Sequence, residues 1–143
     1  MSVLSDTEQQ ALRDALDDEY RAWATYDQVI RDFGAERPFI NIREAEARHI
    51  EALHTLFQRY GLQMPENTWP GRVPRFGSMR QACEAGIEAE TENAALYERL
   101  MRSTNRQDIL TVFGNLRHAS QERHLPAFRR CASRGDGRGA RRE

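Results

Sequence analysis

The chain has 143 residues, 39% hydrophobic and 30% charged, which is typical of one globular domain. All 21 positive charges are arginines, so Schiff-base chemistry on a lysine is excluded. The net charge is −1, and the Arg-rich stretch from Arg129 onward leaves residues 1–128 mildly acidic, which argues against a nucleic-acid partner.

Targeting signals are absent from the sequence. The longest stretch without Asp, Glu or Arg covers residues 109–116, too short to cross a membrane. The first residues contain neither a basic region nor an apolar run, so we expect a cytoplasmic protein with no membrane partner.

Residues 7–33 and 38–60 predict a first helical hairpin. The first segment follows Ser5 or Asp6 as a capping residue, carries apolar side chains at the 3.6-residue period of a helix, and ends at Gly34. The second begins near Pro38, a residue favoured in a first helical turn, and ends before Gly61. The short connection predicts that these two helices are neighbours.

Residues 62–77 predict a long connection, because three prolines and two glycines interrupt them. At about 3.3 Å per residue this stretch reaches about 50 Å, more than a 25-residue helix at about 1.5 Å per residue. The connection is therefore long enough to cross a helical bundle from end to end.

Residues 78–101 and 108–130 predict a second hairpin. Ser78 and Gln81 form a capping-box pattern, and Asp108 is the expected cap of the last helix. Pro126 lies inside this helix, removes one hydrogen bond and crowds the carbonyl of Glu122, so we expect a bend or bulge. We expect an all-α four-helix bundle over residues 1–130 and a disordered Gly/Arg-rich tail over residues 131–143.

The two cysteines, Cys83 and Cys131, are far apart in sequence, and the absence of a C-x-x-C pair excludes zinc ribbons and iron–sulfur centres. In the expected hairpin they lie within about one turn of the same height. We expect free thiols at rest, and favour two separate buried cysteines over a bridge, with a reversible disulfide as the alternative.

Polar side chains interrupt the apolar stripe of every predicted helix. Burying ionised carboxylates together costs several kcal/mol and adds mutual repulsion, and divalent cations offset both effects. Oxygen ligands with one imidazole per ion suit iron or manganese better than zinc. The inward-facing residues are Glu19, Glu46 with His49, Glu90, and His124, one group per helix.

An internal repeat supports this interpretation. Residues 19–26 and 90–97 share Glu, Ala and Tyr at the same offsets, each in the first helix of a hairpin, which implies two related halves. Tyrosines at positions such as Tyr26 and Tyr97 are more often core residues than redox groups. The repeat nevertheless favours a hydrogen bond from each to a ligating carboxylate across the bundle.

At these residues the sequence resembles the ferritin-like di-iron carboxylate superfamily, close to the bundle domain of rubrerythrin and to a small uncharacterised bacterial branch. That class takes a Glu from each of two helices and a Glu-x-x-His pair from each of the other two. Glu19, Glu46, His49, Glu90 and His124 match this pattern. The likeness covers about residues 8–130, in the segments DDEYRAWATY, PFINIREAEARHIEAL, AGIEAETENAALY and ASQERHLPAF.

The match departs from the superfamily at Gln121, three residues before His124, where that pattern has Glu. Either this amide coordinates through its oxygen, or Glu122 reaches the site through a bulge near Pro126, so both are candidate metal ligands. The lost charge predicts two unequal metal positions, with the one at Glu46 and His49 filling first.

The resemblance implies two iron ions, with manganese as an alternative, and a catalytic role for Glu19, Glu46 and Glu90. It implies oxidation of Fe(II) by oxygen or hydrogen peroxide, an external electron donor for peroxidase turnover, and allows a homodimer through an outer helix face. Two other functions stay open. One is a metal-binding or stress-related bundle without turnover, and the other is a structural bundle with a protonated polar core.

Overall fold

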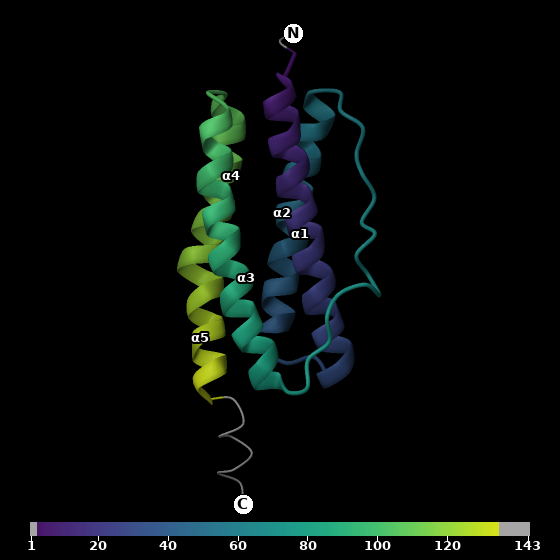
Figure 1. Cartoon of the computed structure of the whole chain (residues 1–143), viewed down its shortest axis with the longest axis vertical. Coiled ribbons are helices and arrows are strands. Elements are labelled where there is room, and N and C mark those ends of the chain that lie inside the picture. Colours follow the sequence, from purple (N-terminus) through teal and green to yellow (C-terminus); the bar gives the residue numbers. More distant parts are fainter. Residues whose placement is uncertain (1–2, 135–143) are drawn as a thin grey trace, which may run out of the picture.

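The computed structural model describes residues 3–134 of the chain. Within that range it contains helices and no strand, and the all-α four-helix bundle expected from the sequence is confirmed (Figure 1). None of the helices in this range is long and apolar enough to span a membrane. The elements are α1 (Asp6–Phe33), α2 (Phe39–Arg59), α3 (Met79–Leu100), the 3-10 turn η1 (Met101–Ser103), α4 (Gln107–Ala119), the π-helical turn η2 (Ser120–His124) and α5 (Leu125–Arg134).

The last three elements form one continuous rod, which we call the fourth rod. The π-helical turn η2 lies directly before Pro126, where the sequence predicts a bulge, and the N–H of Leu125 donates to the carbonyl of Ser120. One extra residue is therefore inserted into the helical repeat just ahead of His124.

The connection between α2 and α3 runs along the outside of the bundle, as the sequence predicts (Figure 1). Its side chains and carbonyls are tied to α1: the hydroxyl of Tyr20 donates to the carbonyl of Pro65 at 2.8 Å, and the indole of Trp69 donates to Asp17 at 3.0 Å. Arg75 pairs with Asp32 further along α1 at 2.6 Å. These bonds hold the crossover in place without a helical hydrogen-bond ladder.

Capping side chains set two of the helix starts, those of α1 and α3. Ser5 and Glu8 form a full capping box at α1. At α3 the box is only half formed, because Ser78 accepts from the N–H of Gln81 while the Gln81 side chain accepts from Gly77. The expected cap at Asp108 is wrong: α4 begins at Gln107, and Asp108 instead accepts from Tyr60 at 2.7 Å. Its carboxylate thus joins α4 to the end of α2.

Two apolar clusters fill the bundle, one toward each end. One contains Leu16, Leu53 and Phe113, and the other contains Phe39 and Phe128. The polar residues singled out by the sequence lie between the two clusters along every rod. The apolar clusters therefore enclose a single polar layer in the middle of the bundle.

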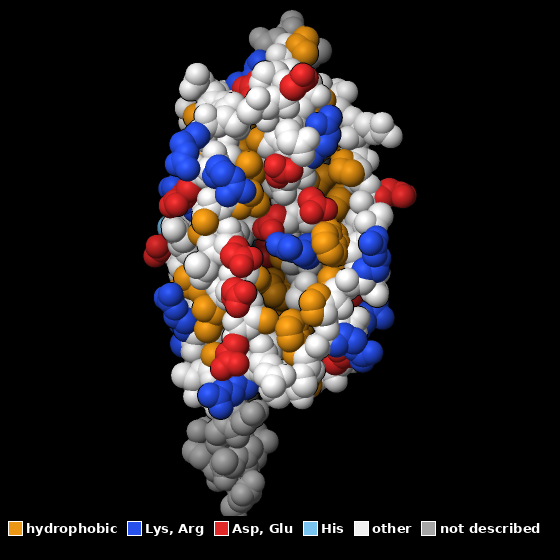
Figure 2. Space-filling view, viewed as in Figure 1, with side chains coloured by type: hydrophobic (Ala, Val, Ile, Leu, Met, Phe, Trp, Pro, Cys, Tyr) orange, Lys and Arg blue, Asp and Glu red, His pale blue; other side chains and the backbone are white. Residues whose placement is uncertain are grey.

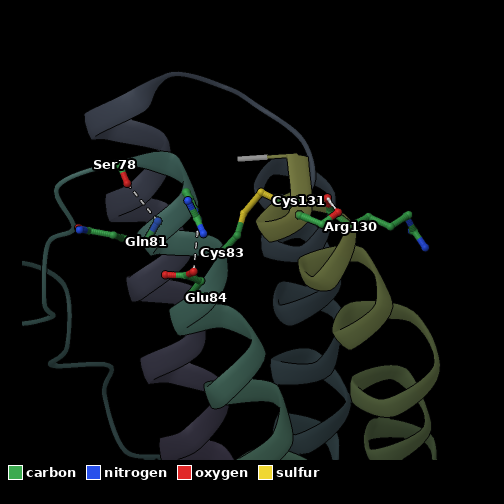
Figure 3. Close-up of a disulfide and its surroundings, with 8 residues drawn as sticks. Ser78, Gln81, Cys83, Glu84, Arg130 and Cys131 are labelled. Carbon is green, nitrogen blue, oxygen red and sulfur yellow. Dashed lines mark hydrogen bonds and ion pairs between the residues drawn. A yellow bond between two sulfur atoms is a disulfide. The ribbon is translucent and has the colours of Figure 1, made fainter. Parts of the chain in front are cut away.

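The two cysteines are bonded to each other, which corrects the expectation of free thiols. Cys83 on α3 and Cys131 on α5 form a disulfide with Cα atoms 5.9 Å apart (Figure 3). The pairing follows from the continuation of α5 to Arg134, so residues 131–134 are helical and the predicted tail begins too early. The rest of that tail, residues 135–143, lies outside the described residues.

Gly86, one turn beyond Cys83, permits close packing between α3 and α5. A Cβ added at Gly86 would lie 2.7 Å from the ring of Phe128, whose side chain is fully buried. An aromatic ring packed against Tyr26 and Phe39 has no free direction in which to move. The glycine is therefore required by packing at this position.

We predict that Gly86→Ala lowers the free energy of unfolding by about 1–3 kcal/mol, because the new methyl group overpacks the Phe128 contact. The matched control is Gly114→Ala in α4, where the nearest atom is Met101 Cε at 3.7 Å. That control should gain about 0.5–1 kcal/mol from helix propensity. Chemical denaturation under the same redox conditions measures both, and equal behaviour of the two variants would contradict the packing argument.

Candidate metal centre

Five side chains from α1, α2, α3 and the fourth rod meet in the polar layer. They are Glu19 from α1, Glu46 and His49 from α2, Glu90 from α3 and His124 from η2. We call this group the carboxylate centre. The three glutamates are 1–3% exposed and His124 is 4% exposed, so all four side chains are buried. Both imidazoles contact carboxylates rather than backbone carbonyls. The structure thus brings together the residues that interrupt the apolar stripes.

Glu46 lies between two overlapping triads. Ligand-type atoms of Glu19, Glu46 and His49 lie within 4.8 Å of one another, and so do those of Glu46, Glu90 and His124. One Glu46 oxygen, Oε1, is 2.9 Å from His49 Nδ1, while the other, Oε2, is 4.0 Å from His124 Nδ1. A single carboxylate therefore offers one oxygen to each triad.

The outer carboxylates of the triads are held in the same way in both halves. Glu19 Oε1 lies 3.2 Å from His49 Nδ1, and Glu90 Oε1 lies 3.2 Å from His124 Nδ1. The remaining oxygen of each glutamate accepts a hydrogen bond from a tyrosine of the other half.

Those tyrosines are the repeated ones. Tyr97 on α3 donates to Glu19 Oε2 at 2.6 Å, and Tyr26 on α1 donates to Glu90 Oε2 at 2.7 Å. Both rings are fully buried, and burial followed by the nearby carboxylate charges raises both tyrosine pKa values well above the usual range. Neutral tyrosines thus orient the carboxylates across the bundle, as the repeat predicts.

Electrostatics shift the pKa values of Glu46 and Glu19 in opposite directions. Burial, reinforced by the charges of Glu19 and Glu90, raises the pKa of Glu46 well above its usual value. Burial also acts to raise the pKa of Glu19, but hydrogen bonds from His49 and Glu46 outweigh it and lower this pKa to about 2. Without a cation, the centre reduces its repulsion by keeping a proton on Glu46.

A polar network that the sequence reasoning missed adjoins the centre. Asn93 is buried, its amide donates to the carboxylates of Asp18 and Glu19, and its carbonyl accepts from the hydroxyl of Ser120. Burial, opposed by the Asn93 hydrogen bond and reinforced by the charge of Glu19, raises the pKa of Asp18 to about 6. The available signal was the position of Asn93, three residues after Glu90 on the same helix face.

Neither candidate for the missing fourth glutamate reaches the centre, because Gln121 and Glu122 are both exposed. The π-helical turn explains this, since its extra residue places Ser120, four residues before His124, in the buried position. The expectation of two unequal metal positions stays a prediction, since Glu46 lies 2.9 Å from His49 Nδ1 and 4.0 Å from His124 Nδ1. Each triad contains one histidine, one outer glutamate and a share of Glu46.

A cavity of about 260 Å³ lies between α1, α3 and the crossover, and Glu90 of the carboxylate centre is among its lining residues. Tyr26, Glu90 and Asn93 line its inner part, and Pro74 and Phe76 of the crossover line its outer part. Figure 2 shows apolar side chains in the hollow of this face, a basic side chain across its middle and acidic side chains beside it. We call this opening the apolar cavity.

Comparison with known proteins supports the fold alone. No protein-family model and no curated protein matches the chain. Among solved structures, a hypothetical protein from Methanococcus jannaschii DSM 2661 is similar over 93% of this chain and 83% of its own, with a TM-score of 0.79 and 23% sequence identity. At that identity the likeness extends to the arrangement of helices and not to the chemistry of the centre.

The residues of the centre fit two divalent cations. Protein oxygen and nitrogen ligands lie about 2.0–2.2 Å from such an ion, so two ligands of one ion are separated by at most about 4.4 Å. The atoms of each triad already lie within 4.8 Å of one another, which small side-chain movements would bring to bonding distance. Three buried carboxylates, when ionised, also offset three of the four positive charges of two divalent cations.

We predict that Mn(II) raises the melting temperature of the metal-free protein, because ligation removes the repulsion among the buried carboxylates. A hundredfold excess over Kd is worth about 2.7 kcal/mol, on the order of ten degrees. Glu46→Gln should lose most of that shift and yet melt no lower than wild type without metal, because burial and the neighbouring carboxylates raise the pKa of Glu46 and so favour the neutral form that Gln resembles.

Glu122→Gln is the matched control, because it makes the same substitution at an exposed side chain of η2. This control should keep the full metal-induced shift in differential scanning fluorimetry. A loss of the shift in Glu122→Gln, or no shift in the wild type, would contradict the assignment of the centre.

Proposed function

We propose that this chain is a ferritin-like di-metal protein that holds two ions, iron first and manganese as the alternative, and oxidises Fe(II) with hydrogen peroxide or oxygen. The observation that supports the proposal is the position of Glu46, with one oxygen directed to each of two Glu/His triads in a buried layer. A carboxylate shared by two ions is how a protein keeps them about 3.5–4 Å apart.

The ligands would divide between the two ions by triad. Glu19 and His49 would hold one ion and Glu90 and His124 the other, each through atoms that already face the centre. The hydrogen bonds from Tyr97 and Tyr26 fix the outer carboxylates, so that one oxygen of each stays directed at its histidine. The apolar clusters above and below close the two ends of the layer to bulk water.

When bound, two Fe(II) ions supply one electron each, which together with two protons convert one hydrogen peroxide molecule into two water molecules. The apolar cavity reaches Tyr26 and Glu90 from the surface, so a small uncharged oxidant has a path to the centre. Asp18 borders that cavity, and with a pKa of about 6 its carboxyl exchanges protons near neutral pH. Asn93 links this carboxyl to Glu19.

Repeated turnover needs a reductant that returns the ions to Fe(II), and we place it outside the chain as an external electron donor. The alternative function, metal binding without turnover, uses the same ligands. The apolar cavity favours turnover over that alternative, because a protein that only sequesters ions needs no route for an oxidant.

We predict that the anaerobic protein binds two Fe(II) ions per chain and that one equivalent of hydrogen peroxide oxidises both, faster than free Fe(II) in the same buffer. Stopped-flow ultraviolet absorbance of Fe(III) measures the rate and the stoichiometry. Glu46→Gln should lose the fast phase by at least about tenfold, because it removes the shared ligand, whereas Glu122→Gln should keep it.

The outcomes separate the three function classes. Two tightly bound ions with no acceleration would contradict the oxidase proposal and favour metal binding without turnover. Absence of metal binding would contradict both and leave a structural bundle with a protonated core.

A further inference from the structure

A second opening lies between α2 and the fourth rod, and shares no lining residue with the apolar cavity. It is a cleft of about 670 Å³, and its lining residues lie in residues 37–49 and 115–134. The imidazole rings of His49 and His124 contribute to its wall, stacked with their centroids 5.7 Å apart. The Nδ1 atom of each ring faces the carboxylates, so the cleft borders the carboxylate centre from its histidine side.

The lining of this cleft is strongly basic. It contains five arginines and no aspartate or glutamate, and we call it the arginine cleft. All five arginine side chains belong to exposed residues, and within residues 3–134 none of them forms an ion pair. The five are Arg37 and Arg48 from the α2 side, and Arg123, Arg130 and Arg134 from the fourth rod.

This charge distribution differs from that of the rest of the bundle. Outside the cleft, eight of the thirteen described arginines meet carboxylates, as in the contacts of Arg43 with Asp27 at 2.7 Å and of Arg75 with Asp32 at 2.6 Å. Five like charges around one concavity repel each other, and an anion placed among them replaces that repulsion with attraction. The guanidinium group also binds phosphate and carboxylate groups through two parallel hydrogen bonds.

We propose that the arginine cleft binds a small polyanion, a molecule with at least two negative charges carried by phosphate or carboxylate groups. The volume suits a small molecule, since ligand pockets are typically about 300–1,000 Å³. Asn41, Asn115 and His118 add neutral polar groups to the lining. A concave site favours such a ligand over the surface of an acidic protein or a nucleic acid, which would rest on the rim.

The proposal is independent of the redox function, because the cleft and its arginines exist without metal ions. The proposal also specifies where a bound polyanion would lie relative to the carboxylate centre. A bound polyanion would cover the histidine side of the centre, while the apolar cavity on the other side stays open. A charged ligand in the cleft and a small uncharged oxidant in the cavity would therefore approach the carboxylate centre from different sides.

The test is isothermal titration calorimetry of the metal-free, full-length, disulfide-bonded chain with pyrophosphate and, in a separate arm, citrate. We expect at least one of them to bind, with the stronger arm showing which anionic group is preferred. The double variant Arg48→Gln/Arg123→Gln should weaken that binding at least tenfold. The matched control is Arg13→Gln/Arg72→Gln, which removes the same charge at exposed residues outside the cleft and should change the affinity less than twofold.

A second measurement locates the ligand. In NMR spectra of the histidine side chains, the bound anion should shift the signals of His49, His118 and His124, which line the cleft. The signals of His54 should not shift, because His54 does not line the cleft. Its ring nitrogen Nε2 lies 2.9 Å from the hydroxyl of Tyr20 instead. Melting curves of all variants confirm that they are folded before affinities are compared.

Three results would overturn the proposal. They are the absence of binding in both arms, an equal loss of affinity in the two double variants, and binding of an acidic protein or oligonucleotide without binding of either small anion. Failure of Fe(II) oxidation would leave these measurements unaffected, so the two proposals stand or fall separately.

Discussion

The burial of three carboxylates in one layer of the bundle is the constraint on which the rest of the structure depends. Each of Glu19, Glu46 and Glu90 would favour water, and together they repel each other. Two tyrosine hydroxyls and two imidazoles lie within hydrogen-bond distance of these carboxylates. A raised pKa favours a proton on Glu46 when no cation is present. The apolar clusters on both sides provide the stability that holds such an unfavourable layer together.

The two halves of the bundle solve this problem with the same parts. Each outer glutamate faces a histidine of its own half and a tyrosine of the other, so neither half has a complete centre alone. The equivalence ends at Glu46, whose position in the second half is taken by Ser120. One shared carboxylate then serves both triads, and Asn93 occupies the space next to Ser120. The centre is symmetric in its outer ligands and asymmetric in its shared one.

The surroundings of the centre are different on its two sides. The side of α1 and α3 opens through the apolar cavity, while the side of α2 and the fourth rod opens through the arginine cleft. The two openings have no lining residue in common, so side chains with different chemistry can control access to the centre from each side. Gly86 and the Cys83–Cys131 disulfide hold α5 close to α3, and thereby keep the fourth rod in the position that shapes the cleft.

The sequence by itself determined the helices, the crossover and the inward position of Glu19, Glu46, His49, Glu90 and His124, because apolar periodicity, breakers and caps are local properties. It also indicated the role of Tyr26 and Tyr97 through the internal repeat. Only the tertiary structure decided which residue precedes His124 in the buried layer, because the π-helical turn shifts the register by one residue and turns Ser120 inward instead of Gln121 or Glu122. The disulfide and the arginine cleft likewise depend on how far α5 continues and how closely it packs against α3 and α2. These are distances between helices, which residue spacing along the sequence does not determine.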